Sequence, residues 1–472
     1  MQKAKVPLTN FQFGEVSPAL ISRTDTKVYN NSAQKIENFF LRAEGGVIKR
    51  AGLKKIYEFD TSIDTSKVQQ HRLVPFIFSD DERYIVSLEH QKIRVFSIDT
   101  NNNVTLATTL TTDSSGANIP ITNLNMHEVT YAQSGDVMFI AHQTFMIRKL
   151  VRTGLTSFGM ETMTFDTQSA GAKIYQPYFQ FQDLGVTLDP SASSGNGITL
   201  TTSANYWDTT GSQSGGNYPD SLHVGLTIKY HDQEITITSV QSATQATGNA
   251  LATLKKKLKV DSFRTDNGVA TVTVTLVNHG FSAGDAFTIT NANTVGGIAA
   301  SNLNGARTVA EVIDDNLFTF NAAANANDSV AGGGTPFLET YAPATNWSEQ
   351  SYSALRGYPG AVTFHQGRLW FAGTVSQPDG LWASKSNEFF NFDIGDASDN
   401  DSIDIRATIG EVNTVRHLVS NRDLQCFTTT DEFIVPAFTE KPTTPTNATI
   451  KRQTPFGSSF VRPYVFDGAT VD

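Results

Sequence analysis

The sequence has a single cysteine, Cys426, among 472 residues. One cysteine excludes both an internal disulfide and a metal site built from several thiolates. The protein therefore does not need an oxidising compartment in order to fold. Because Cys426 lies in an apolar segment, we expect it to be an inert thiol in the core.

Long apolar runs are also missing. No stretch approaches the 18 consecutive apolar residues of a transmembrane helix, and the first twenty residues lack the apolar segment of a secretory signal. We therefore expect a soluble protein that is assembled in a reducing cytoplasm.

Charged residues are scarce at 17%, and the net charge is −10. A protein that grips nucleic acid neutralises phosphates with clustered Lys and Arg, so this balance predicts weak contact with DNA. An acidic wall would instead let DNA slide past. The one strong basic run, 255–259, is expected to be a solvated face.

The short motifs of common enzyme classes are absent: there is no P-loop, G-x-G-x-x-G, G-x-S-x-G or H-E-x-x-H. A hydrolase that uses a pair of carboxylates would leave no such motif. The best remaining candidates are in the acidic loop, which we define as Asp393, Asp396, Asp399, Asp401 and Asp404. Asp399, Asp401 and Asp404 are weak candidates for a hard cation; the alternative is a solvated loop with turn-forming aspartates. We assign no catalytic residue, no cofactor and no firm metal site.

Short alternating apolar segments dominate two regions, 70–160 and 346–472. Their spacing of roughly 8–12 residues indicates a sandwich, barrel or propeller. Ser376–Trp382 resembles the Asp-box turn of sialidase-type propellers, although it also fits an ordinary Pro-Asp-Gly turn. Residues 176–345 are instead rich in Gly, Ser, Asn, Thr and Ala. We therefore expect a mainly β protein with a β-propeller-like core and an inserted small β-barrel or β-sandwich region.

Four parts follow from this pattern. Residues 1–60 form an N-terminal arm for docking, with a short helix predicted over 32–42 that Ser32 caps and Gly45-Gly46 ends. Residues 61–175 form the first blades and 176–345 the insert. Residues 346–472 form further blades, and we expect the natural chain to continue beyond Asp472.

The arm carries the most specific pattern. Asn10-Phe11-x-Phe13-Gly14-Glu15-x-Ser17-Pro18 precedes Arg23-x-Asp25, Tyr29, Asn38, Gly45-Gly46 and Arg50-x-Gly52. This pattern resembles the opening of the tail nozzle, or tail tubular protein B, family of short-tailed (podovirus-type) bacteriophages, which is related to packaged-DNA stabilisation proteins. Ser22 and Ala51 depart from it, where the family usually has glycine and proline.

Two further stretches are similar to the same family. One contains Asp136 and His142, and the other contains Gly367, Arg368, Gly373 and Trp382. The resemblance covers roughly 1–160 and 350–472 and does not extend clearly to the insert. The residues named in these two stretches are expected to be structural parts of the propeller, and His142 and His365 to be hydrogen-bonded structural histidines.

The resemblance implies a structural, non-enzymatic protein of the virion tail. It implies a β-propeller core in a ring of six copies below the portal and adaptor, with tail fibres as neighbours. Viral DNA would pass through the lumen during ejection without sequence-specific contact, and the ring could also retain packaged DNA. The motif residues of the arm would then serve assembly, with Phe11, Phe13 and Tyr29 as apolar anchors and Glu15, Arg23 and Asp25 paired; the alternative is an intramolecular brace.

A second hypothesis is a tail-tip propeller that binds or cleaves a glycan of the host outer surface. It would use the acidic loop or a pocket lined by Trp370 and Trp382.

Overall fold

The structure is a computed structural model that describes residues 10–20, 22–59, 71–168, 173–395, 398–407, 413–437, 442–466 and 469–471. It is almost entirely β, with a four-bladed propeller-like arrangement and curled larger sheets, so the expected fold class is confirmed. The chain divides into two compact units, Met1–Asp64 and Thr65–Asp472. In the part of the chain described, no helix is long and apolar enough to cross a membrane.

The first unit is the arm. It contains η1 (Pro18–Leu20), α1 (Lys27–Asn30), β1 (Phe39–Leu41) and β2 (Val47–Lys49). The predicted helix over 32–42 is wrong, because Phe39–Leu41 pairs antiparallel with Val47–Lys49. Aromatic and β-branched residues favour this pairing, and Gly45 supplies the left-handed backbone (φ +87°) of the turn between the strands.

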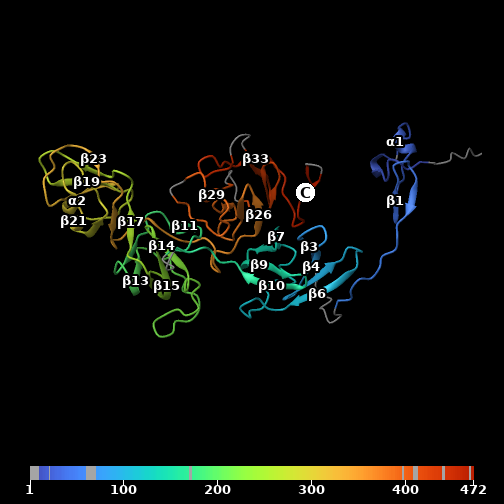
Figure 1. Cartoon of the computed structure of the whole chain (residues 1–472), viewed down its shortest axis with the longest axis horizontal. Helices are drawn as coiled ribbons and strands as arrows, with labels where there is room; N and C mark the ends of the chain where they lie inside the picture. Colours follow the sequence, from blue (N-terminus) through green and yellow to red (C-terminus); the bar gives the residue numbers. More distant parts are fainter. Residues whose placement is uncertain are drawn as a thin grey trace, which may run out of the picture. The chain divides into compact units, whose positions relative to one another are not determined.

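Four antiparallel sheets of four strands form the blades (Figure 1, blue to teal and orange to red). Blade A contains β3 (Arg72–Ile77), β4 (Arg83–Glu89), β5 (Lys92–Ile98) and β6 (Val104–Leu110). Blade B contains β7 (Thr130–Ser134), β8 (Val137–His142), β9 (Phe145–Gly154) and β10 (Ser157–Thr162). Blade C contains β26 (Ala361–His365), β27 (Arg368–Ala372), β28 (Gly380–Ala383) and β29 (Ile403–Arg406). Blade D contains β30 (Val415–Ser420), β31 (Leu424–Thr428), β32 (Glu432–Val435) and β33 (Lys451–Thr454), and the pair β34 (Tyr464–Phe466) and β35 (Ala469–Val471) follows.

Three apolar cores hold the blades face to face in the order A, B, C, D. Val86 and Phe158 belong to the core between A and B, Phe139 and Phe371 to that between B and C, and the core between C and D includes Cys426. These cores form because successive side chains of a strand point to opposite faces, so alternating apolar residues meet the neighbouring blade. Complete burial of one large apolar side chain contributes about 1.5–3 kcal/mol.

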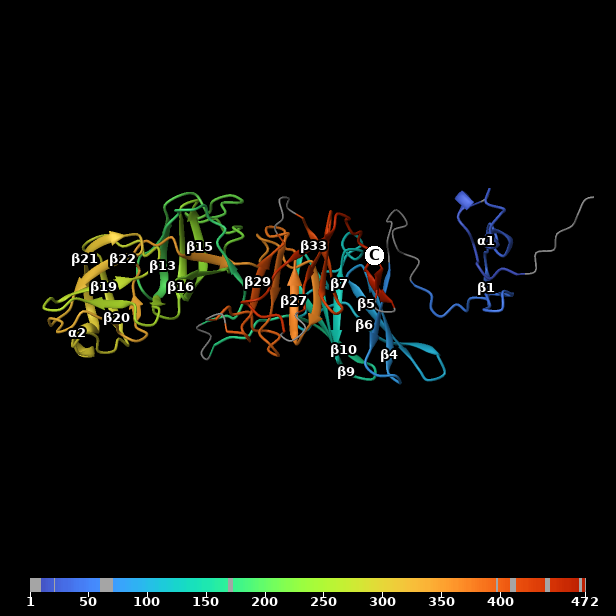
Figure 2. The same cartoon turned by 90° about the horizontal axis from the view of Figure 1, so that it is seen from above.

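The insert consists of two larger sheets that lie side by side (Figures 1 and 2, mostly green to yellow), and the segment that forms one interrupts the sequence of the other. The outer module is a seven-stranded sheet of β11 (Tyr178–Phe179), β12 (Leu188–Pro190), β13 (Gly195–Thr202), β14 (Thr227–Tyr230), β15 (Gln233–Ser242), β16 (Gln245–Ala250) and β25 (Trp347–Gln350). The inner module lies between β16 and β25 in the chain. It contains α2 (Ala300–Leu303) and an eight-stranded sheet of β17 (Lys255–Lys257), β18 (Phe263–Thr265), β19 (Thr271–Thr275), β20 (Ala286–Thr290), β21 (Gly305–Asp314), β22 (Leu317–Asn321), β23 (Ala331–Gly332) and β24 (Phe337–Glu339).

Candidate functional site

Several motif residues of the arm hold its first segment, near Gly14, against the hairpin that follows in the sequence. Gly14 has φ +67°, and a Cβ there would lie 2.9 Å from Leu41 Cδ1, so this glycine lets the first segment approach the hairpin. Glu15 accepts a hydrogen bond of 2.9 Å from the backbone N of Ile36. A Cβ on Gly45 would lie 2.1 Å from Asn10 Oδ1.

Other motif residues act locally. Arg23 donates two hydrogen bonds to Asp25, of 2.9 and 3.0 Å, and the pKa of the Asp25 carboxyl is lowered mainly by this contact. Glu15, which was expected to join this ion pair, bonds to the backbone instead. The backbone N of Arg50 donates to Asn38 O at 2.8 Å.

The remaining motif residues either form turns or are glycines with no neighbouring atoms close to the position of a Cβ. Ser17 Oγ accepts from Ala19 N at the start of η1, whose first residue is Pro18. Tyr29, which is half-buried, donates its backbone N–H to the N-cap hydroxyl of α1. A Cβ on Gly46 or on Gly52 would meet nothing within 4 Å.

The arm exposes much of its apolar surface. All six residues of β1 and β2 are exposed, with Phe40 at 56% and Ile48 at 40%. Phe13, one of the expected anchors, is 49% exposed, whereas Phe11 is half-buried. None of the five apolar core clusters found among the described residues includes a residue of the arm.

Asp136 holds an arginine that joins blades A and B. Arg152 of β9 donates to Asp136 Oδ1 at 2.8 Å and also to the Glu82 carboxylate and the Tyr84 hydroxyl. Its guanidinium lies 4.2 Å from the ring centre of Phe78. The pKa of Arg152 is raised, mainly by its hydrogen bond to Tyr84.

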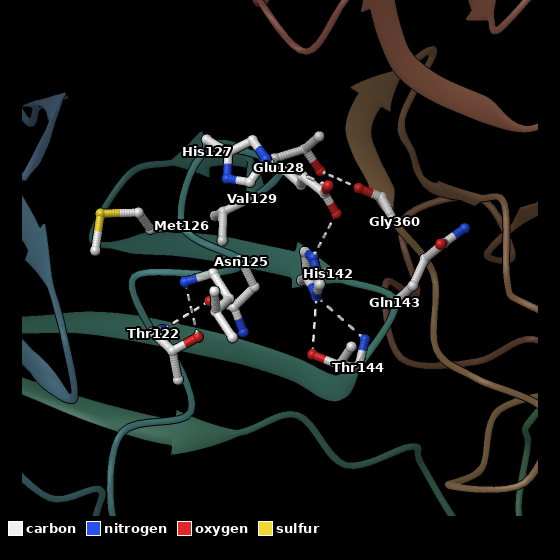
Figure 3. A network of polar contacts seen from close by, with 12 residues as sticks. Thr122, Asn125, Met126, His127, Glu128, Val129, His142, Gln143, Thr144 and Gly360 are labelled. Carbon is white, nitrogen blue, oxygen red and sulfur yellow. Dashed lines mark hydrogen bonds and ion pairs between the residues drawn. The ribbon is translucent and has the colours of Figure 1, made fainter. Parts of the chain in front are cut away.

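His142 ends β8 and is enclosed in a network of polar contacts (Figure 3). Its Nδ1 accepts from the backbone N of Thr144 at 3.2 Å, which leaves the proton on Nε2, 3.1 Å from Glu128 Oε2. Burial lowers the pKa of His142, against the opposing effect of Glu128. The histidine is therefore fully hydrogen-bonded and neutral.

Residues beside His142 attach blade B to blade C. Gln143 Nε2 donates to Gly373 O at 2.9 Å, and Thr130 Oγ1 donates to Gly360 O at 2.7 Å. Gly373 has φ +68°, and a Cβ there would lie 2.8 Å from Val415 O of blade D. Glycine is needed at this position because any other side chain would push blades C and D apart.

Arg368 fastens a loop to blade C. It is 2% exposed, and its guanidinium donates to the carbonyl oxygens of Ser384, Asp399 and Asp401. Gly367, with φ +68°, makes the turn that precedes it.

The prediction of a glycan-binding pocket lined by Trp370 and Trp382 is wrong. Trp370 is fully buried and Trp382 is 1% exposed, because β27 and β28 are covered on both faces. Trp382 packs edge-on against Tyr352 at 5.1 Å. Both rings are parts of the core and cannot stack on a ligand.

Three of the four described carboxylates of the acidic loop are each paired with a different basic group. Asp393 meets Lys173 at 2.8 Å, Asp401 meets Lys385 at 2.8 Å, and Asp404 pairs with Arg406. The pKa of Asp404 is raised by burial, although Arg406 opposes this. Asp396 lies outside the described residues. Within the described ranges, no three His, Cys, Asp or Glu side chains gather where they could hold a metal ion, so Asp399, Asp401 and Asp404 do not form a cation cage.

A buried charged cluster at the base of the insert was missed by the sequence reasoning. Glu349 of β25 is fully buried and accepts two hydrogen bonds from Arg356, of 3.0 and 2.7 Å. The Tyr206 hydroxyl donates to the same carboxylate, and His223 Nε2 lies 3.4 Å away. Burial would raise the pKa of Glu349, but the contacts with His223 and Arg356 outweigh it and lower the pKa. The available signal was the alternation that places Glu349 on the same face as Trp347.

A cavity of about 860 Å³ opens between the two modules of the insert. Part of the basic run lines it, together with Gln180, Asn278 and Asn346. Lys256 of this run pairs with Asp232 at 3.0 Å, so its charge is partly neutralised rather than freely solvated.

Comparison with known proteins does not assign the chain to a family. No family model and no curated protein matches it. A solved structure of the phage phi92 endosialidase is similar at 12% identity with a TM-score of 0.17, over 72% of this chain and 60% of the endosialidase. The exo-inulinase of Aspergillus awamori is similar at 10% identity with a TM-score of 0.14, over 59% of this chain and 67% of the inulinase. The chain thus spans about three fifths of the endosialidase, and neither similarity establishes an activity.

Proposed function

We propose that the chain is a non-enzymatic structural protein of a short bacteriophage tail, in which copies form a ring around a channel for DNA. The proposal joins the resemblance of the arm to the tail tubular protein B family with the propeller-like core. On this proposal the ring has six copies, lies below the portal and adaptor, and contacts the tail fibres.

The observation that carries the proposal is the exposed apolar hairpin of the arm. A two-stranded hairpin is marginally stable alone, and monomeric soluble proteins seldom leave contiguous apolar surface in water. Phe39, Phe40 and Leu41 would be buried if the arm packed against another subunit. The arm is therefore suited to assembly.

The charge of the chain supports a conduit. A net charge of −10 disfavours lasting contact with the phosphates of DNA, and a channel through which a genome passes requires such weak contact. The role as an enzyme is not favoured. The tryptophans proposed for glycan binding are core residues, and three aspartates of the acidic loop, Asp393, Asp401 and Asp404, are paired with Lys or Arg.

Electron microscopy of the purified full-length chain tests the proposal. We expect rings with a central hole in negative stain, and no sugar released from host-surface polysaccharide incubated with the same preparation. Monomeric particles without a hole at micromolar concentration, or release of sugar, would overturn the structural role.

A further inference from the structure

We infer that the arm hairpin, β1 and β2, docks on an apolar face of blade A in a second copy of the chain. The inference rests on the proposed function and deepens it, since it names the two surfaces that join neighbouring copies.

The docking surface is one side of blade A. Cross-strand partners share a face, so the register defines rows of side chains across the sheet. One row is Pro75, Ile85, Phe96 and Leu106, and every member is apolar. We define the blade-A face by its accessible apolar residues: Leu73, Pro75, Ile77, Ile85, Ile98, Val104 and Leu106.

The blade-A face differs from the faces of the other blades. Leu73 is 61% exposed, Ile77 is 59% exposed and Leu106 is 42% exposed, whereas the opposite side of the same sheet is buried against blade B. In the described strands of blades B, C and D, no large hydrophobic side chain is exposed. Among the described strands of the four blades, those of blade A alone therefore carry large exposed apolar side chains. These lie on its edge strands, β3 and β6, whereas Ser87, Arg94 and Phe96 at the centre of the same face are buried.

Strand addition at the β3 edge of blade A is disfavoured. Pro75 has no N–H to offer along β3, and the Gln133 side chain already bonds to the backbone N and O of Ile77, at 3.0 and 2.8 Å. A partner that covers the exposed side chains of β3 is therefore expected to pack on the face rather than extend the sheet at this edge.

The arm hairpin has a matching free face. Phe40 stands opposite Ile48, and both side chains point to the side away from Leu41, which the segment at Gly14 approaches. Phe40 is 56% exposed and Ile48 is 40% exposed, so both side chains are accessible to a partner. Packing them on the blade-A face would dehydrate both surfaces at once.

Charge favours a copy of this chain as the occupant. Residues 35–55 hold six basic and two acidic side chains, a net of +4, in a chain whose total is −10. The exposed Asp80 and Asp81 follow the blade-A face directly, at the turn after β3. Opposite charges at the rim would steer the hairpin to this face. Because each copy carries both surfaces, successive copies can be joined head to tail in a closed ring.

Disulfide mapping on the full chain tests the inference. Phe40→Cys is combined in turn with Leu73→Cys, Ile77→Cys and Leu106→Cys, and each protein is oxidised and run on non-reducing gels. Cys426 is buried and burial raises its pKa to about 12, so it adds little background. We expect dimers and larger multimers from at least one pair, and none from the control pair Phe40→Cys with Leu155→Cys, in which the second site is an exposed loop residue of blade B.

An intramolecular cross-link, which runs as a compact monomer, would overturn docking between copies, and so would the absence of any cross-link. Phe40→Asp gives an independent measurement. We expect it to weaken self-association at least about tenfold in sedimentation, while Leu53→Asp, an exposed arm residue outside the hairpin, leaves association unchanged. Rings that persist in Phe40→Asp would refute the hairpin contact but leave the proposed ring intact, whereas a lack of rings in the unaltered protein would refute the proposed function.

Discussion

Acid should destabilise the insert through His231. This residue is 6% exposed, neither ring nitrogen has a hydrogen-bond partner, and its ring packs 4.3 Å from that of Tyr230. Burial, aided by Lys256 and opposed by Asp232, lowers the pKa of His231 from 6.5 to about 4. The folded state therefore holds fewer protons than the unfolded state between these values.

The sign and size of the effect follow from this difference. Stability is fully present above pH 6.5 and is lost as the pH falls toward 4, because protons bind the unfolded chain first. A shift of 2.5 units corresponds to a limit of about 3.4 kcal/mol, of which about 2 kcal/mol is lost by pH 5. His231→Asn removes the titrating group, and asparagine tolerates the left-handed backbone (φ +54°) at this position.

Urea unfolding followed by tryptophan fluorescence measures the effect. Trp207 and Trp347 lie in the same apolar core as Tyr230, so they report on the outer module. Between pH 7.5 and pH 5, wild-type protein should lose about 2 kcal/mol more than His231→Asn does. The exposed His90 serves as the control, since His90→Asn should follow the wild type. Parallel pH profiles for wild type and His231→Asn would refute the reasoning.

Three further outcomes are expected. Glu349→Gln should lower the free energy of unfolding by roughly 3–5 kcal/mol in urea, because it leaves the partly buried guanidinium of Arg356 without a counter-charge; a change below about 1 kcal/mol would contradict this. Gly373→Ala should cost more than about 2 kcal/mol, from left-handed strain and a clash with Val415 O, whereas Gly135→Ala, with open space around it, should cost only the strain of about 1–2 kcal/mol. Cys426 should react with a disulfide reagent at pH 8 about 1000-fold more slowly in the native protein than in urea, because burial raises its pKa from 9.0 to about 12; equal rates would show that the thiol is accessible.

The strands of the blades could be predicted because their signal is local. In β3 the short apolar run from Leu73 to Ile77 predicts an extended chain, whereas only the structure shows that Val74 and Phe76 are buried and that Leu73 and Ile77 are exposed. In the arm, prediction from local sequence patterns gave the wrong secondary structure. Ala33, Ile36 and Phe40 have helical spacing, yet Phe40 pairs with Ile48 across a turn, and this non-local pairing overrides a weak local preference.

The predictions of functional sites were wrong where segments distant in the sequence bury or pair the side chains in question. Trp382 could be placed on a strand from its neighbours, but only the fold shows that both faces of β28 are buried. The acidic loop could be seen in the sequence, but its partners Lys173 and Lys385 come from other parts of the chain. Arg368 could be tied to the propeller by resemblance, whereas the three carbonyls it holds could not be foreseen.

The way in which the insert joins the core has a consequence for how such proteins can diversify. Its first and last strands, β11 and β25, are hydrogen-bonded neighbours, and Ser351 N donates to Pro177 O at 2.9 Å. The chain therefore leaves and rejoins the blades at nearly one point, so a different cassette, or a simple turn, can bridge the gap with little change in backbone geometry. The inner module is tied in the same manner by β17 and β24. Genetic exchange could thus replace either layer of this nested pair while the blades keep their packing.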